Sequence, residues 1–249
     1  MYGDFAAVYD RLMDDVDYVS WAAYYVRLME IYGKHPRYVA ECACGTGSLT
    51  VRFARAGLTV TGLDLSQRML EAAQEKARRA GVQAQFARQD MRALTLGRRV
   101  DAVLATCDGV NYLTTLRDVG AFFSAAYRAL RPGGGLFFDI SSAYKLKQVL
   151  ANAFYGEERE DIAYLWQNRL DEASQTVDMD LTFFVREADG RYRRFAERHR
   201  QRAHTQDEIA QALYRAGFED VRVFGDRDFS PPARDCQRIH FAAQKPQDE

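Results

Sequence analysis

Apolar and polar positions along the first 140 residues of the chain alternate between two periods. Residues 37–42 (RYVAEC) and 58–64 (LTVTGLD) have the apolar run or the period-two alternation of strands. Residues 48–56 between them have a helical pattern that ends at a glycine. Residues 66–81 place apolar side chains at every third or fourth position, behind a Ser suited to cap a helix and ahead of a Gly. Strands that alternate with helices predict parallel βαβ units.

The same pattern continues to the end of the chain with one interruption. Residues 82–90, 99–108 and 135–140 (GLFFDI) predict three further strands. A capping box at residues 205–208 predicts a last helix, and the segments FEDVRVFGD and RIHFAAQK after it predict two more strands. The sequence therefore predicts an α/β fold with seven strands.

Residues 141–204 interrupt the alternation of strands and helices. They contain the alternating runs YLWQNRL, TVDMDLTFFVRE and RYRRFAERHRQRA, joined at residues 172–174 and at Asp189-Gly190. Asp-Gly between two such runs is a strong hairpin signal. We expect an inserted antiparallel subdomain at the carboxyl ends of the parallel strands, where open α/β sheets bind their ligands.

A glycine-containing loop follows the first predicted strand, in the run ECACGTGS (residues 41–48). Glycine lets a ligand approach the backbone, and the helix that starts there offers free N–H groups. Asp64 ends the second strand about 20 residues further on, where a carboxylate can accept hydrogen bonds from both hydroxyls of a ribose. Together the loop and Asp64 predict a ligand that contains adenosine.

The loop favours one of the two cofactor classes that use this arrangement. A dinucleotide site needs a third small residue at position 50, where this chain has Thr50. S-adenosylmethionine has no pyrophosphate, and an acid such as Glu41 can interact with its ammonium group, directly or through water. A nicotinamide oxidoreductase is the residual alternative.

Composition narrows the possible functions further. The 249 residues are 47% apolar with a formal net charge of −1, so the chain can bury a full core but has no overall field to hold a phosphate backbone. We find neither a signal peptide nor 18 consecutive apolar residues, and we expect a cytoplasmic protein without membrane contact. The four cysteines predict reduced thiols and no metal site.

Five ordered segments carry a resemblance to a known family: ECACGTGSLT, GLDLSQRMLEAA, RQDMRAL, the stretch 101–112 and LRPGGGLFFDI. They are similar to successive motifs of class I S-adenosylmethionine-dependent methyltransferases over residues 37–140. The resemblance implies a Rossmann-like, seven-stranded mixed sheet with helices on both faces, whose last strand is antiparallel. It places the cofactor domain at residues 37–140 and 205–249, the inserted antiparallel subdomain at 141–204 and an N-terminal helical lid at 1–36.

The resemblance also implies roles for individual residues. Gly45 and Gly47 would line the cofactor, Asp64 would hold the ribose and Leu65 would pack on the adenine. The segment FAAVYDRLMDDVDYVSW resembles the lid of small-molecule N-methyltransferases, including aminosugar N,N-dimethyltransferases, in which the tyrosine of VYD approaches the sulfonium; here this is Tyr9. The remaining expected cofactor contacts are Glu41, Cys42, Ala43, Cys44, Met69, Asp90 and the Met91 backbone at the adenine edge, and Cys107 and Asp108 beside the methionine part.

Methyl transfer from a sulfonium is an in-line displacement, so positioning of the acceptor can supply most of the catalysis. An amine acceptor must also lose a proton, for which Tyr112 and His199 are the candidate bases. Tyr9, expected at the sulfonium end, is the third candidate catalytic residue. The sequence thus predicts a monomeric or homodimeric methyltransferase that acts on a small amine or hydroxyl compound.

Two other functions stay open. Arg198, Arg200 and Arg202 recur at period two, which fits a solvated strand edge but also a phosphate-binding face for a nucleotide-linked sugar or RNA. Under the second hypothesis, the chain is an RNA-modifying methyltransferase that uses this face. In the third it is a regulatory or assembly protein that binds the cofactor without turnover.

Overall fold

The main sheet of the protein has seven strands in the order β10-β11-β5-β4-β1-β2-β3. The computed structural model describes residues 3–32 and 35–247, with side chains from residue 5 onward. Neighbouring strands among β1 to β5 are parallel, and β11 runs antiparallel to both β5 and β10. The predicted mixed sheet with an antiparallel last strand is confirmed, although β11 lies one strand inside the edge. The strands are β1 (Tyr38–Cys42), β2 (Thr59–Asp64), β3 (Gln85–Arg88), β4 (Val100–Ala105), β5 (Leu130–Ser141), β10 (Glu219–Phe224) and β11 (Arg238–Gln244).

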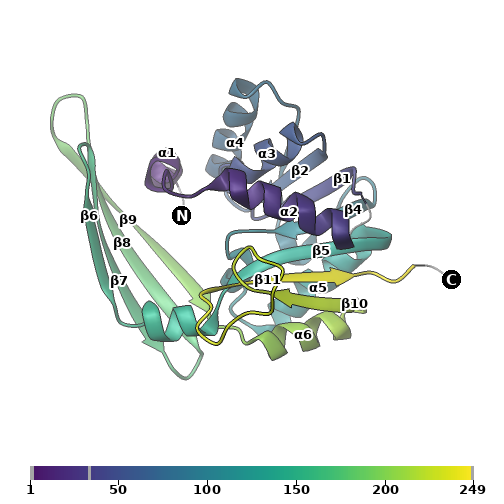
Figure 1. The fold of residues 1–249 in the computed structure, drawn as a ribbon. Helices are drawn as coiled ribbons and strands as arrows, with labels where there is room; N and C mark the ends of the chain where they lie inside the picture. Colours follow the sequence, from purple (N-terminus) through teal and green to yellow (C-terminus); the bar gives the residue numbers. More distant parts are fainter. Residues whose placement is uncertain (1–2, 33–34, 248–249) are drawn as a thin grey trace.

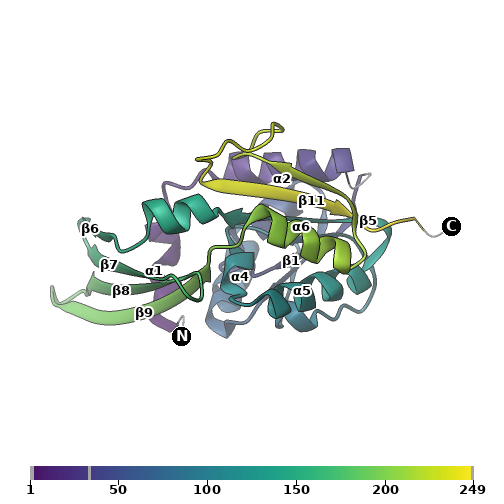
Figure 2. The same ribbon diagram turned by 90° about the horizontal axis from the view of Figure 1, so that it is seen from below.

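Helices cover both faces of this sheet, as Figure 2 shows. One face is covered by α2 (Tyr18–Tyr32) and α3 (Ser48–Arg55), and the other by α5 (Leu116–Ala129) and α6 (Gln206–Arg215). α4 (Gln67–Arg79) packs beside β2 and β3. The predicted caps are present, because Ser66 accepts a hydrogen bond from the Met69 N–H and residues 205–208 form a capping box. No helix among the described residues is long and apolar enough to cross a membrane.

The inserted segment forms a separate antiparallel sheet in the order β6-β7-β8-β9, which stands beside the main domain (Figure 1). Three of its strands were predicted, and the hairpin around Asp189-Gly190 is confirmed. The short edge strand β6 was not predicted, because five residues give too little pattern to separate a strand from a loop. The strands are β6 (Phe154–Glu158), β7 (Ile162–Asp171), β8 (Thr176–Arg186) and β9 (Tyr192–Arg202).

The two faces of the inserted sheet differ in chemistry. Cross-strand pairs such as Phe183 with Phe195 and Met179 with His199 share the face that looks toward the main domain. At one end this inner face packs on α1, and at the other on Leu146 of the π-helical turn η3 (Lys145–Val149). The opposite face carries charged pairs such as Asp178 with Arg200.

The N-terminal segment divides into two parts with different packing. Helix α1 (Gly3–Leu12) lies between α4 and the inserted sheet, with Phe5 buried against Met69 and Phe183. The sequence predicted a single lid over residues 1–36, and this needs correction for α2. Tyr25 of α2 is fully buried with strand residues of the main sheet, so α2 belongs to the core layer and only α1 lies off the sheet. Residues 1–2 and 33–34 of the predicted lid lie outside the described residues.

One buried side chain fastens both ends of the inserted segment. Asn111, in the short helix η2 (Gly109–Tyr112) after β4, donates from Nδ2 to the carbonyl oxygens of Ser141 (3.0 Å) and Arg202 (2.9 Å). Its Oδ1 accepts from the Ser141 N–H at 2.9 Å. The chain therefore leaves and re-enters the main domain at one point, next to the loop that follows β4.

Candidate active site

The glycine-rich loop after β1 takes a left-handed backbone conformation at three alternate residues. φ is 53° at Ala43, 54° at Gly45 and 72° at Gly47. A Cβ on Gly47 would meet the Cβ of Ala73 at 2.8 Å, so this glycine lets α4 pack on the loop. A Cβ on Gly45 would meet nothing within 4 Å among the described residues. The loop thus offers open backbone at Gly45, as a ligand site requires.

Asp64, at the end of β2, braces this loop from the neighbouring strand. Its Oδ2 accepts the Gly45 N–H at 2.9 Å and its Oδ1 accepts the Ser66 N–H at 2.8 Å. Burial raises the pKa of Asp64, and these backbone hydrogen bonds oppose the rise. A carboxylate has about four lone-pair sites, so two acceptor positions remain for ligand hydroxyls. The next side chain, Leu65, is 58% exposed, which offers an apolar surface at the same edge.

Glu41 lies one residue before the end of β1 and is only 1% exposed. It accepts hydrogen bonds from the hydroxyls of Thr50 and, at 3.1 Å, Thr106. Burial raises the pKa of Glu41 to about 7, and the two hydroxyl hydrogen bonds oppose this rise. Thr50, whose presence argued against a dinucleotide site, therefore holds the acid in place.

Other loop residues expected at the cofactor have mainly structural contacts. Cys42 and Cys44 are buried, and burial raises the pKa of both thiols, so they behave as inert packing residues. Met69 is 3% exposed and packs in the cluster under α1. Asp90 forms an ion pair with Arg92, which lowers its pKa, and Met91 begins the short helix η1 (Met91–Ala93). Their contacts with a cofactor stay predictions.

The loop after β4 is held by a buried carboxylate that the sequence analysis missed. Cys107 and Asp108 both have left-handed backbones, with φ of 54° and 55°. Their N–H groups donate to the two oxygens of Asp139, at 2.7 and 2.9 Å. Asp139 is fully buried in β5 and also accepts from Tyr25 at 2.9 Å and pairs with Arg238. Asp139 thus fixes the loop on which two predicted site residues stand.

Asp108 connects this loop to the inserted sheet. Its Oδ2 accepts from Gln201 Nε2 of β9 at 2.6 Å, and its Oδ1 accepts from Arg238 of β11 at 2.9 Å. Arg238 therefore links Asp108 and Asp139 from a third element. Gln201 and Arg238 carried no signal in the sequence, because each partner is about a hundred residues away.

The structure brings together two of the three candidate catalytic residues. The Tyr112 hydroxyl of η2 lies 3.3 Å from Nδ1 of His199 in β9, with the rings edge to face. Tyr112 is 41% exposed, whereas His199 is 7% exposed and also contacts the Phe5 ring of α1. Burial lowers the pKa of His199, and nearby Asp108 opposes this effect. A neutral imidazole thus lies behind a partly exposed hydroxyl.

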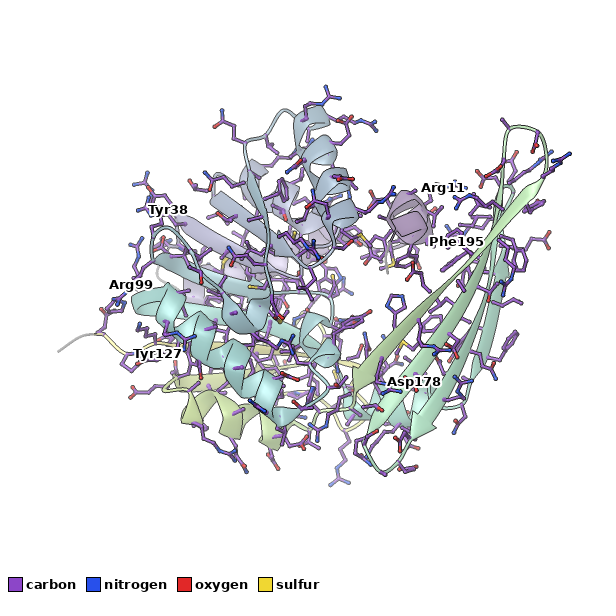
Figure 3. The ribbon with its side chains drawn as sticks, turned by 180° about the vertical axis from the view of Figure 1, so that it is seen from behind. Arg11, Tyr38, Arg99, Tyr127, Asp178 and Phe195 are labelled. Atoms are coloured by element: carbon purple, nitrogen blue, oxygen red, sulfur yellow. The ribbon has the colours of Figure 1, made fainter. Side chains whose placement is uncertain are left out.

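Tyr9 comes to the same region from α1. Burial raises its pKa well above the usual range, and the groups that add to this rise include Tyr18, Cys107 and Tyr112. Figure 3 shows α1, marked by Arg11, beside Phe195 of the inserted sheet. Tyr9 therefore keeps its proton. Its side chain extends from α1 toward the loop after β4 and packs with the inserted sheet.

Comparisons with known proteins identify the family of this chain. Residues 39–134 match the model of a methyltransferase domain. A relative from Geobacillus sp. (strain WCH70), which is named as a methyltransferase, is 36% identical to this chain. The match covers 98% of this chain and 99% of the relative. This chain belongs to the S-adenosylmethionine-dependent methyltransferases.

Two further relatives extend the comparison. The crystal structure of an S-adenosylmethionine-dependent methyltransferase from Clostridium acetobutylicum ATCC 824 superposes on this methyltransferase with a TM-score of 0.89 and 30% identity. That match covers 98% of this chain and 99% of the other. A dTDP-3-amino-3,4,6-trideoxy-α-D-glucopyranose N,N-dimethyltransferase from Streptomyces venezuelae is 32% identical over 53% of this chain and 54% of its own. The cofactor of this methyltransferase is S-adenosylmethionine.

The arginines of the outer sheet face are engaged in ion pairs in this methyltransferase. Arg198 pairs with Asp180 at 2.6 Å and Arg200 with Asp178 at 2.5 Å, each directly across from its partner on β8. Arg202 pairs with Glu208 at 2.7 Å. These acids offset the positive charge of the three residues, which weakens the attraction of this face for a phosphate.

His204, just after β9, is 1% exposed, and its Nε2 contacts the Leu113 carbonyl oxygen at 2.9 Å. Burial lowers its pKa to about 4, so it serves as a neutral packing residue. The described part of the chain contains no cluster of three or more potential metal ligands.

Proposed function

We propose that this methyltransferase transfers a methyl group to the amine of a small molecule bound between α1, η2 and the inner face of the inserted sheet. The observation that carries the proposal is the contact between Tyr112 and His199, 3.3 Å apart and drawn from two different parts of the fold. The pair lies beside the loop of Cys107 and Asp108, at the edge where the parallel strands end. This edge is where ligands bind in open α/β sheets.

The residues of that edge suit the cofactor. We assign the open backbone at Gly45 and the N–H groups that begin α3 to its methionine carboxylate, and the free lone pairs of Asp64 to its ribose. Leu65 supplies a surface for adenine, and Asp90 with the Met91 backbone lies at the next strand end. Glu41 lies beneath the loop to balance the ammonium group. When bound, S-adenosylmethionine supplies the electrophilic methyl group.

The tyrosine and the histidine can remove the acceptor proton together. Because Tyr112 is partly exposed and His199 is buried behind it, the Tyr112 oxygen can take the proton of the acceptor nitrogen while its own proton passes to His199 Nδ1. The lowered pKa of His199 keeps the imidazole neutral near pH 7, and therefore able to accept that proton. Tyr9 stays protonated and positions the sulfonium end.

The acceptor class follows from the chemistry of these groups and from one relative. A neutral histidine is a suitable base for an ammonium group, whose pKa is far closer to its own than that of an aliphatic hydroxyl. The relative from Streptomyces venezuelae is named for N,N-dimethylation of an aminosugar nucleotide. Both points favour nitrogen over oxygen as the methylated atom.

The decisive experiment measures methyl transfer from labelled S-adenosylmethionine to a panel of small amines, small alcohols and phenols, and unmodified RNA. We expect turnover on amines, including amino sugars. His199→Gln should lower kcat by about 100-fold, within the usual range for loss of a general base, and remove the acid limb of the pH profile. Tyr112→Phe keeps the ring contact and should lower kcat while S-adenosylhomocysteine binds as in the wild type.

Three results would contradict the proposal. Turnover confined to hydroxyl compounds would show that the acceptor is an alcohol or phenol and not an amine. Turnover confined to RNA, with a steep loss of affinity in added salt, would show that the acceptor is RNA. Cofactor binding without turnover on any member of the panel would indicate a silent binding protein. Full amine turnover by His199→Gln would refute the assigned base but leave the acceptor class intact.

A further inference from the structure

Lys76 of α4 joins α1 to the glycine-rich loop. Its Nζ donates hydrogen bonds to Asp10 Oδ1 of α1 at 2.8 Å, Thr46 Oγ1 at 2.9 Å and Ser48 Oγ at 2.6 Å. An ammonium group has three N–H donors, so these contacts use all of them. The Lys76 side chain is only 24% exposed, which places its charge under α1 and away from bulk water.

Thr46 closes the network from the loop side. Its hydroxyl donates to the same Asp10 oxygen at 2.6 Å and accepts from Lys76. Thr46 is 1% exposed and lies between Gly45, which we assign to the cofactor, and Gly47, on which α4 packs. The Thr46 hydroxyl therefore makes both of these hydrogen bonds only when α1 is docked.

The same helix carries Tyr9 into the active site. Tyr9 and Asp10 are consecutive, so their side chains leave α1 about 100° apart. Asp10 faces Thr46 and Lys76, whereas Tyr9 faces Cys107 and Tyr112. The contact of Asp10 with Lys76 consequently sets how α1 is rotated and where the Tyr9 hydroxyl lies.

The network can also be released at small cost. A hollow of about 490 Å³ lies on its outer side, and Asp10, Ser48 and Lys76 are among the residues that line it. Water in this hollow can compete for the ion pair, and the Asp10 side chain is 46% exposed. Ion pairs with this degree of exposure are weak, so these polar contacts can break before the apolar contacts of Phe5 and Val8 that also hold α1.

We propose that Lys76 is a positioning residue that couples docking of α1 to the shape of the glycine-rich loop, so that entry and release of the cofactor require the Lys76, Asp10 and Thr46 contacts to break. The inference rests on the proposed placement of Tyr9 and the loop at the cofactor. It does not depend on the identity of the methyl acceptor.

The test compares Lys76→Met, Lys76→Arg and Arg79→Met in the full chain, with S-adenosylhomocysteine as the probe. Met keeps the length of the side chain but donates nothing, so the ligand should dissociate about tenfold faster and bind correspondingly more weakly. Hydrogen exchange in α1 should rise by a similar factor, with no change in β5. Arg79 lies almost one turn along the same helix and pairs with Glu75, so Arg79→Met serves as the matched control and should behave as the wild type.

The conservative variant separates a positioning role from simple packing. Arg keeps the positive charge, but its planar guanidinium cannot direct three N–H groups to the same oxygens as an ammonium. Lys76→Arg should therefore show slower dissociation than Lys76→Met, but faster dissociation than the wild type. If Lys76→Met does not fold, Thr46→Val removes the two contacts of the Thr46 hydroxyl from the loop side with little change in volume. Wild-type dissociation and wild-type exchange of α1 in either folded variant would overturn the proposal. Because the probe needs no acceptor, failure of amine turnover would leave this result interpretable.

Discussion

The carboxylate of Asp64 accepts the backbone N–H of Gly45 at 2.9 Å, across the gap between the first two strands of the sheet. The same carboxylate accepts the Ser66 N–H that leads into α4. One acid therefore braces both the glycine-rich loop and the start of α4, and in the proposed site its remaining lone pairs bind the ribose. Under this proposal both the loop and the affinity for cofactor should be sensitive to Asp64.

Asp64→Asn should weaken binding of S-adenosylhomocysteine by about 10- to 100-fold. The substitution loses charged hydrogen bonds to the ribose, each worth about 1.5–3 kcal/mol, and turns an amide N–H toward a backbone donor. Calorimetry measures the change, with Asp118→Asn as a control because Asp118 pairs with Arg92 at the surface. Unchanged affinity in a folded Asp64→Asn protein would remove Asp64 from the cofactor site.

Alanine at the two glycines of the loop should give opposite phenotypes. Gly45→Ala meets no neighbour and pays only the strain of φ 54°, about 1 kcal/mol, but its methyl group enters the ligand space and should abolish binding. Gly47→Ala collides with Ala73 at 2.8 Å and should unfold at lower denaturant, by about 2–3 kcal/mol. Urea unfolding and calorimetry on both variants test the contrast, which fails if Gly45→Ala binds normally.

The raised pKa of Glu41 predicts how the free energy of unfolding depends on pH. Its pKa is raised from 4.5 to about 7 in the folded protein, so the unfolded chain loses this proton first as pH rises. Its contribution to stability is fully present below pH 4.5 and is lost as pH rises through 7, by about 3 kcal/mol in total. Urea unfolding between pH 5 and pH 8 should show this loss in the wild type and not in Glu41→Gln. An identical slope in both proteins would contradict the assignment.

Binding of the cofactor should respond to the same proton in the opposite sense. The charged form of Glu41 favours an ammonium group nearby, so affinity for S-adenosylhomocysteine should rise with pH between 6 and 8. Glu41→Gln should bind more weakly and lose this dependence. Calorimetry at a series of pH values measures it, and a rising affinity that persists in Glu41→Gln would assign the effect to another group.

Asp139→Asn should destabilise the protein by about 3–5 kcal/mol, because it leaves the mostly buried Arg238 with one carboxylate partner instead of two. The double variant with Arg238→Met should cost less than the sum of the single variants, since it removes the uncompensated charge. Thermal and urea unfolding of the three proteins test this cycle. Additive losses would show that the two side chains act independently.

Periodicity predicted the elements of this fold but could not predict the contacts between them. The strand before Asp64 and the helix after Ser66 follow from local pattern, and the structure confirms both. The candidates Tyr112 and His199 were each chosen for their position in the chain, yet only the packing of β9 on η2 shows that they meet. Site roles for these residues stay predictions.

The residues that sequence reasoning missed share a physical cause. Asp139 and Arg238 are 99 positions apart, and nothing in local composition connects them. An acid within the apolar run GLFFDI was a usable signal for Asp139, because a buried charge needs a partner. The acid partners of Arg198 and Arg200, by contrast, had no comparable signal, since their pairing with Asp180 and Asp178 depends on strand register.

The amide of Asn111 binds both junctions of the inserted sheet, so the two ends of the segment between Ser141 and Arg202 are held together at one side chain of the main domain. Because both ends meet at this one side chain, a segment of different sequence can replace it without changing the strand order of the main sheet. If acceptor choice resides in the inserted sheet, as proposed, a chimera that keeps Asn111 and both flanking strands takes its acceptor preference from the protein that supplies the segment.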